Sequence, residues 1–202
     1  MGNANLNSGS VNMQKKIVRL IYKNRGLLMV PPVVFMVLCT WKEIENDALV
    51  FGLGGIVFGM GLCLRIWSQM HLHHRLKVHK ILTTTGPYVY IRNPCYVANI
   101  LILTGAAFLS ELFWFAPLML VYCAIVYSFV VRYEEAKLTK QYGTLYTEYF
   151  SRVPRWFPRS WPLQKTFSTK RREFLGPSIF VEMHNLLLVI PFLIKEASSY
   201  FH

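Results

Sequence analysis

The stretch YVANILILTGAAFLSELFWFAPLMLVYCAIVYSFVV, residues 96–131, decides the fold class of this chain. Glu111 is its only charged residue. A helix rises about 1.5 Å per residue, so roughly 20 apolar residues cross a hydrocarbon core of about 30 Å. The stretch is therefore long enough for nearly two crossings. It predicts a helical hairpin that turns at residues 109–112.

A second long apolar run precedes this hairpin, in residues 47–69, and is broken only by Arg65. The whole chain of 202 residues is 53% hydrophobic and 16% charged, whereas a soluble domain is usually about 25% charged. These apolar runs exclude a soluble protein. We predict an all-α integral membrane protein, multi-pass, with about five membrane-associated helices including the hairpin.

Three further helices are expected around the hairpin. A first helix, residues 13–41, is basic at its start, and Pro31-Pro32 should kink or interrupt it because neither proline donates the helical hydrogen bond. A second helix, residues 48–72, is rich in glycine and should form a packed interface. A last apolar segment, residues 177–197, is short for a span and is equally compatible with an interfacial helix. For that segment we expect a packing or anchoring role, with substrate gating as the alternative.

The charge distribution predicts the orientation in the membrane. The formal net charge is +12. The basic residues lie before the apolar part of the helix expected over residues 13–41, after the apolar run in residues 47–69, and after the hairpin. This positive-inside pattern predicts a cytoplasmic N-terminus and a cytoplasmic active site. Anionic headgroups are a sufficient partner for the basic loops, so we expect no nucleic acid. We divide the chain into a disordered tail (1–12), a membrane core (13–158) and a basic linker with a C-terminal apolar helix (159–202).

Four histidines lie within residues 71–79 and raise the possibility of a metal site. Metal-bound histidines usually donate their second ring nitrogen to a carboxylate or carbonyl, and no carboxylate lies nearby in the sequence. We interpret the stretch as a basic segment at the membrane exit and predict no metal site.

Three motifs flank the hairpin. The first is LTTTGPYVYIRNPCY, residues 82–96, in which Gly-Pro and Asn-Pro mark turns or helix boundaries. The second is the pair Glu134-Glu135 near the end of a membrane helix. Two carboxylates so close to the bilayer are unfavourable in free energy unless positively charged groups pair with them. The third is the run from Tyr142 to Pro158, whose tyrosines at helical spacing form one aromatic face.

These motifs, in this order and with the hairpin between them, resemble the isoprenylcysteine carboxyl methyltransferase family, which is grouped with the membrane phospholipid methyltransferases. The resemblance covers about residues 48–158. It implies S-adenosyl-L-methionine as the cofactor, held in a non-Rossmann pocket at the cytoplasmic ends of the last core helices.

The resemblance also implies a set of site residues. Glu134 and Glu135 would receive the ammonium or the ribose hydroxyls of the cofactor, while Tyr142 and Tyr146 would close over the adenine or sulfonium. Ring faces attract cations by about 0.5–2 kcal/mol. Asn93 stands where many members have histidine. The implied cofactor-binding residues are Gly86, Pro87, Tyr88, Tyr90, Asn93, Pro94, Tyr96, Glu134, Glu135, Leu138, Tyr142 and Tyr146.

The transfer would be a direct displacement at the methyl carbon, in which positioning of the reactants is worth about 7–11 kcal/mol. A carboxylate acceptor needs only an anion-holding arginine, for which Arg92 is the first choice and Arg155 the second. An amine acceptor needs a base, which would be Glu135 or His79. Both chemistries stay open at this point.

The resemblance favours an isoprenylcysteine-like carboxylate, with a phospholipid amine or a non-catalytic lipid-binding scaffold as alternatives. The expected partners are a lipid or prenylated small molecule and membrane lipids.

Overall fold

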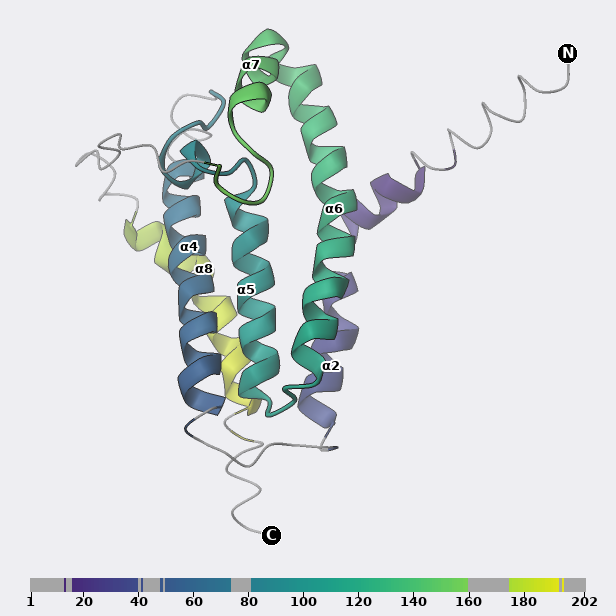
Figure 1. Cartoon of the computed structure of the whole chain (residues 1–202), viewed down its shortest axis with the longest axis vertical. Coiled ribbons are helices and arrows are strands. Elements are labelled where there is room, and N and C mark those ends of the chain that lie inside the picture. Colours follow the sequence, from purple (N-terminus) through teal and green to yellow (C-terminus); the bar gives the residue numbers. More distant parts are fainter. Residues whose placement is uncertain are drawn as a thin grey trace, which may run out of the picture.

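The computed structural model describes residues 13, 16–39, 41, 48, 50–73, 81–159, 175–192 and 194. Within these residues every regular element is helical and no strand occurs, which confirms the all-α prediction. The expected disordered tail, most of the histidine-rich stretch and the basic linker lie outside the described residues. The helices that run along a common bundle in Figure 1 are α2 (Val30–Leu38), α4 (Gly55–His73), α5 (Pro94–Leu109), α6 (Phe115–Tyr142) and α8 (Leu175–Leu186).

Two helices are long and apolar enough to cross a membrane, at Val50–Leu72 and Phe115–Tyr142. The first of them begins with a short π-helix, η2 (Val50–Gly54), that continues into α4. Helix α5 is apolar throughout but shorter. The chain is therefore an integral membrane protein, and the helix expected over residues 48–72 is confirmed.

The first predicted helix is interrupted, but its two prolines are not where it breaks. Helical segments Lys16–Lys23 and Leu27–Leu38 are bent by 73° at a break that precedes Pro31. Both prolines lie in the first turn of α2, after the 3-10 turn η1 (Leu27–Met29). A first-turn position requires no intrahelical N–H donor, so proline is tolerated there. The expected site of interruption is therefore wrong by several residues.

The predicted hairpin is present, with α5 and α6 in contact and their connection at the lower end of the bundle (Figure 1). Helix α5 ends at Leu109, where the Ser110 hydroxyl donates to the carbonyl of Ala107 at 2.9 Å. Glu111 has a φ of 65°, a left-handed conformation that reverses the chain. The turn therefore lies at the place the sequence indicated.

Glycines bring α4 and α5 close together, as the sequence predicted, but only some of them take part. A Cβ at Gly61 would lie 2.8 Å from Ile102, and one at Gly105 would lie 2.5 Å from the backbone nitrogen of Phe58. Such distances are shorter than any normal contact. At Gly52, Gly55 and Gly59 a Cβ would meet nothing within 4 Å, so these three do not serve the interface.

The end of the bundle opposite the hairpin turn carries the sequence motifs. There α6 ends at Gly143, whose φ of 56° lets the chain turn into α7 (Thr144–Arg152). The 3-10 turn η4 (Gly86–Val89) lies against α4 at this same end. Helix α8 packs along α4 and is followed by the 3-10 turn η6 (Leu187–Val189). Segments far apart in the sequence therefore meet around one end of the bundle.

Candidate functional site

A cavity of about 380 Å³ lies at this motif-bearing end of the bundle. Its size falls in the range of about 300–1,000 Å³ that small-molecule sites occupy. Its wall combines tyrosine rings, one carboxylate and several basic or amide side chains from α4, α5, α6 and α7. Eight of the residues singled out in the sequence line it: Tyr88, Arg92, Asn93, Tyr96, Glu134, Leu138, Tyr142 and Tyr146.

The other predicted residues do not line this first cavity but lie near it in the fold. Gly86 has a φ of 65°, and a Cβ on it would lie 2.4 Å from the His71 ring, so only glycine fits there. Pro94 occupies the first turn of α5, and the Tyr90 ring contacts Trp67. The remaining residues outside the cavity wall are Pro87, Glu135 and Arg155.

His71 packs against the first sequence motif. Its Nδ1 lies 3.1 Å from the Thr85 hydroxyl, and its ring packs on Gly86. Among the described residues no three His, Cys, Asp or Glu side chains are grouped so that they could hold a metal ion. His74 and His79 fall outside the described residues.

The three predicted catalytic residues form one network centred on Glu135. Arg92 Nη2 lies 3.3 Å from Glu135 Oε1, and Arg155 Nε donates to the same oxygen at 3.2 Å. Arg155 Nη2 donates to the second oxygen, and the Asn93 amide lies 3.4 Å from Oε1. Glu135 is buried, and its hydrogen bond raises the pKa of the Arg155 guanidinium. Arg92 and Arg155 thus balance the negative charge of Glu135, which would be unfavourable in free energy near the membrane without them.

Arg92 also ties α7 to the cavity wall. Its Nη1 donates to the carbonyl of Phe150 at 2.9 Å, and its guanidinium lies 3.7 Å from the centre of the Phe150 ring. Its backbone N–H donates to the carbonyl of Pro154. Phe150 was not singled out in the sequence, because one aromatic residue on a helix face carries no signal of its own.

Glu134 differs from its neighbour because it faces the first cavity. The Tyr96 hydroxyl donates to its Oε2. Burial raises the pKa of Tyr146, which also lines this cavity, to about 12, so this phenol stays neutral at physiological pH. The Tyr149 hydroxyl donates to the carbonyl of Tyr88 at 2.7 Å, and burial raises the pKa of both phenols. The first cavity therefore offers one carboxylate among neutral tyrosine rings.

A second cavity, of about 340 Å³, is mainly apolar. Arg65 and Asn99 line both cavities, so the two adjoin at these side chains. The rest of its wall comes from the region around α2 and from α5, α6 and α8: Gly26, Met29, Val30, Val33, Val34, Ile102, Leu103, Tyr127 and Asn185.

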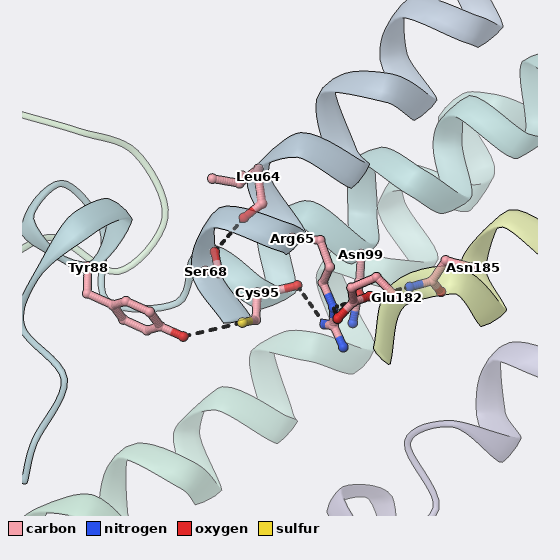
Figure 2. Close-up of polar contacts among 8 residues, drawn as sticks. All are labelled: Leu64, Arg65, Ser68, Tyr88, Cys95, Asn99, Glu182 and Asn185. Atoms are coloured by element: carbon pink, nitrogen blue, oxygen red, sulfur yellow. Dashed lines mark hydrogen bonds and ion pairs between the residues drawn. The ribbon is translucent and has the colours of Figure 1, made fainter. Parts of the chain in front are cut away.

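Arg65 belongs to a polar cluster within the helical bundle that Figure 2 shows in detail. Its Nε donates to both oxygens of Glu182, at 3.0 and 3.1 Å, and its Nη1 donates to Asn99 at 2.8 Å. We did not assign Arg65 a role from the sequence. The sequence did offer one indication, because a charged residue in the middle of an apolar run is a candidate functional residue.

Comparison with known proteins now adds to this geometry. Residues 47–145 match the family model of phospholipid methyltransferases. Over these residues the chain is similar to the phospholipid methyltransferases. The match spans α4, the first motif, the hairpin and the glutamate pair, and so confirms the resemblance found in the sequence. It supports a membrane methyltransferase that uses a methyl donor such as S-adenosylmethionine.

Two curated relatives are named for metal resistance. The nickel-cobalt-cadmium resistance protein NccN of Alcaligenes xylosoxydans xylosoxydans is 28% identical over 59% of this chain and 54% of its own length. The cobalt-zinc-cadmium resistance protein CzcN of Cupriavidus metallidurans is 27% identical over 72% of each chain. This chain thus spans about half the length of the first relative. No solved structure matches it.

Proposed function

We propose that this protein transfers a methyl group from S-adenosylmethionine to the carboxylate of a lipid-like acceptor, such as an isoprenylcysteine. The observation that carries the proposal is the pair of adjoining cavities. One is polar and aromatic, the other is mainly apolar, and they share Arg65 and Asn99. A donor with charged groups suits the first cavity and an apolar chain suits the second.

The residues of the first cavity fit the methyl donor. S-adenosylmethionine supplies an activated methyl group on a sulfonium, together with an ammonium and a carboxylate. Glu134 would receive the ammonium, and the rings of Tyr142 and Tyr146 would attract the positive sulfonium. Arg92, in the same wall, would pair with an anionic group of the donor or acceptor.

The second cavity would hold the apolar chain of the acceptor. Val30 and Val34 in its wall are exposed on the outside of the bundle, which would face lipid. We therefore propose that the acceptor enters sideways from the bilayer. Its headgroup would then reach the junction at Arg65 and Asn99, next to the donor.

The placement of Glu135 favours a carboxylate acceptor over an amine. An amine must lose a proton, and Glu135 was one of the two expected bases, the other being His79, which lies outside the described residues. This side chain lies behind the cavity wall, and both of its oxygens accept hydrogen bonds from Arg155. A carboxylate acceptor needs no base. Its oxygen forms the new bond to the methyl carbon while the carbon–sulfur bond breaks and its electron pair stays on sulfur, leaving a methyl ester and a neutral thioether.

We further propose that this site faces the cytoplasm. The cavity lies at the end of α6 that carries Arg132, Lys137 and Lys140. Basic residues flank membrane helices preferentially on the cytoplasmic side.

Methyl transfer from labelled S-adenosylmethionine tests the proposal. The purified protein in nanodiscs is incubated with S-farnesylcysteine or with a phospholipid extract, and the product is then treated with mild alkali. We expect label in S-farnesylcysteine that alkali releases as methanol, because esters hydrolyse under these conditions. Alkali-stable label in lipid would indicate amine methylation. An absence of both transfer and donor binding would leave the non-catalytic scaffold as the better account.

A further inference from the structure

Arg65 is a charged residue within the membrane-spanning segment Val50–Leu72. Its side chain is 19% exposed and that of Glu182 is 2% exposed. Removing two charges from water is expensive, and a buried ion pair often stabilises a fold no better than apolar residues would. A pair of this kind within a membrane bundle is therefore a candidate for a functional role.

The guanidinium is held on two sides. From α8, Glu182 accepts hydrogen bonds from Nε, and Glu182 in turn accepts one from the Asn185 amide. From α5, the carbonyl of Cys95 and the side chain of Asn99 accept hydrogen bonds from Nη1, at 3.3 and 2.8 Å. Figure 2 shows these partners converging on Arg65 from the two helices. Such contacts fix the direction of a long side chain that would otherwise adopt many rotamers.

Arg65 lines both cavities, whereas Glu182 lines neither. The arginine is thus accessible at the point where the headgroup of an acceptor would lie, and its carboxylate partner lies behind it. Arg92, by contrast, lines only the first cavity, which we assign to the donor.

We propose that Arg65 binds the carboxylate of the acceptor and that Glu182, supplied by α8, is its resident counter-ion. The proposal rests on the proposed function and adds the residue that selects the acceptor. Methylation converts an anion into a neutral ester, so an arginine that relied on the acceptor alone would be left unpaired inside the bundle. Glu182 keeps Arg65 paired before the acceptor binds and after the ester forms. The C-terminal helix, which lies beyond the family match, is thereby part of the acceptor site.

The counter-ion also affects the reaction rate. In the transition state the negative charge of the carboxylate disperses as the oxygen–carbon bond forms. A fully positive Arg65 would stabilise the anionic ground state more than this transition state, and such binding does not accelerate the chemical step. By neutralising part of the positive charge, Glu182 keeps the acceptor from being bound too tightly.

Steady-state kinetics of Glu182→Gln test the counter-ion. With S-farnesylcysteine as acceptor in nanodiscs, we expect KM and kcat to fall together, each by about tenfold, while kcat/KM changes little. Glu182→Asp, which retains the charge, should stay within about threefold of the wild type in both constants. A merely structural role would lower kcat/KM without lowering KM, and that outcome would overturn the proposal.

Arg65→Gln tests the arginine. We expect the KM for S-farnesylcysteine to rise by about tenfold or more, with a thermal unfolding transition like that of the wild type as the control for folding. If Arg65→Gln does not fold, Arg65→Lys takes its place. It should also raise KM, because an ammonium cannot satisfy Asn99, the Cys95 carbonyl and a carboxylate with the same geometry. An unchanged KM in the folded variant would refute the assignment. The proposed function itself fails separately, if the wild-type protein methylates no acceptor.

Discussion

Two adjacent carboxylates, Glu134 and Glu135, have different surroundings and should respond differently to substitution. Glu134 faces the first cavity, whereas Glu135 is buried between Arg92 and Arg155. Removing one partner of a buried ion pair costs about 3–5 kcal/mol, because it leaves charge uncompensated.

We therefore predict that Glu135→Gln mainly lowers the free energy of unfolding, whereas Glu134→Gln mainly weakens donor binding. For Glu134→Gln we expect about a tenfold loss of affinity for the demethylated donor, since a charge-assisted hydrogen bond contributes about 1.5–3 kcal/mol. Thermal unfolding and calorimetric titration of both variants in nanodiscs provide the measurements. The opposite pattern would mean that the two carboxylates have been assigned to the wrong roles.

The sequence indicated both glutamates but could not separate them. Consecutive residues on a helix point in directions about 100° apart, so only one of the two could face a given cavity. Which one does so depends on where α5 and α7 pack around α6, and the partners Arg92 and Arg155 lie far from the pair in sequence. Arg65 could have been singled out from its charge within an apolar run, but its pairing with Glu182, 117 positions away, could not be predicted.

The packing of α4 against α5 depends on particular glycines. A Cβ at Gly105 would lie 2.5 Å from the Phe58 nitrogen, in the backbone of the facing helix, which cannot move aside as a flexible side chain could. Gly59 lies on the same helix as Phe58, but a Cβ there would meet nothing within 4 Å. These two positions form a matched pair.

We predict that Gly105→Ala destabilises the bundle by about 1–3 kcal/mol, the usual cost of overpacking. Gly59→Ala should be neutral or slightly stabilising, because alanine is the better helix former by about 1 kcal/mol. Thermal unfolding in the same detergent compares the two variants. An equal loss of thermal stability in Gly105→Ala and Gly59→Ala would contradict the described interface between α4 and α5.

The elements themselves could largely be predicted from the sequence. The lengths of the apolar runs set the helix over residues 48–72 and the hairpin, because bilayer thickness constrains both. The break in the first helix could not be placed correctly. Proline is compatible with the first turn of a helix, so Pro31-Pro32 marks the start of α2 rather than the bend at residues 24–26.

The whole molecule brings a polar, aromatic cavity next to an apolar one, and no sequence pattern predicted the second. Its wall is assembled from five regions of the chain, of which only the glycine-rich α4 and the hairpin were expected to pack closely. Helix α8 contributes to it through Asn185, although a packing or anchoring role was favoured for the last apolar segment over substrate gating. We propose that these two cavities separately hold donor and acceptor.

Blocking the second cavity tests that claim most directly. Val33 lies in its wall and not in that of the first cavity, so Val33→Trp should fill it, while Ile125→Trp on the exposed face of α6 serves as the matched control. We predict that Val33→Trp lowers methylation of S-farnesylcysteine by about tenfold or more and leaves the affinity for the demethylated donor within about twofold. The control should change neither quantity. Unchanged methylation in Val33→Trp, or an equal loss of donor binding, would contradict the assignment of separate donor and acceptor cavities.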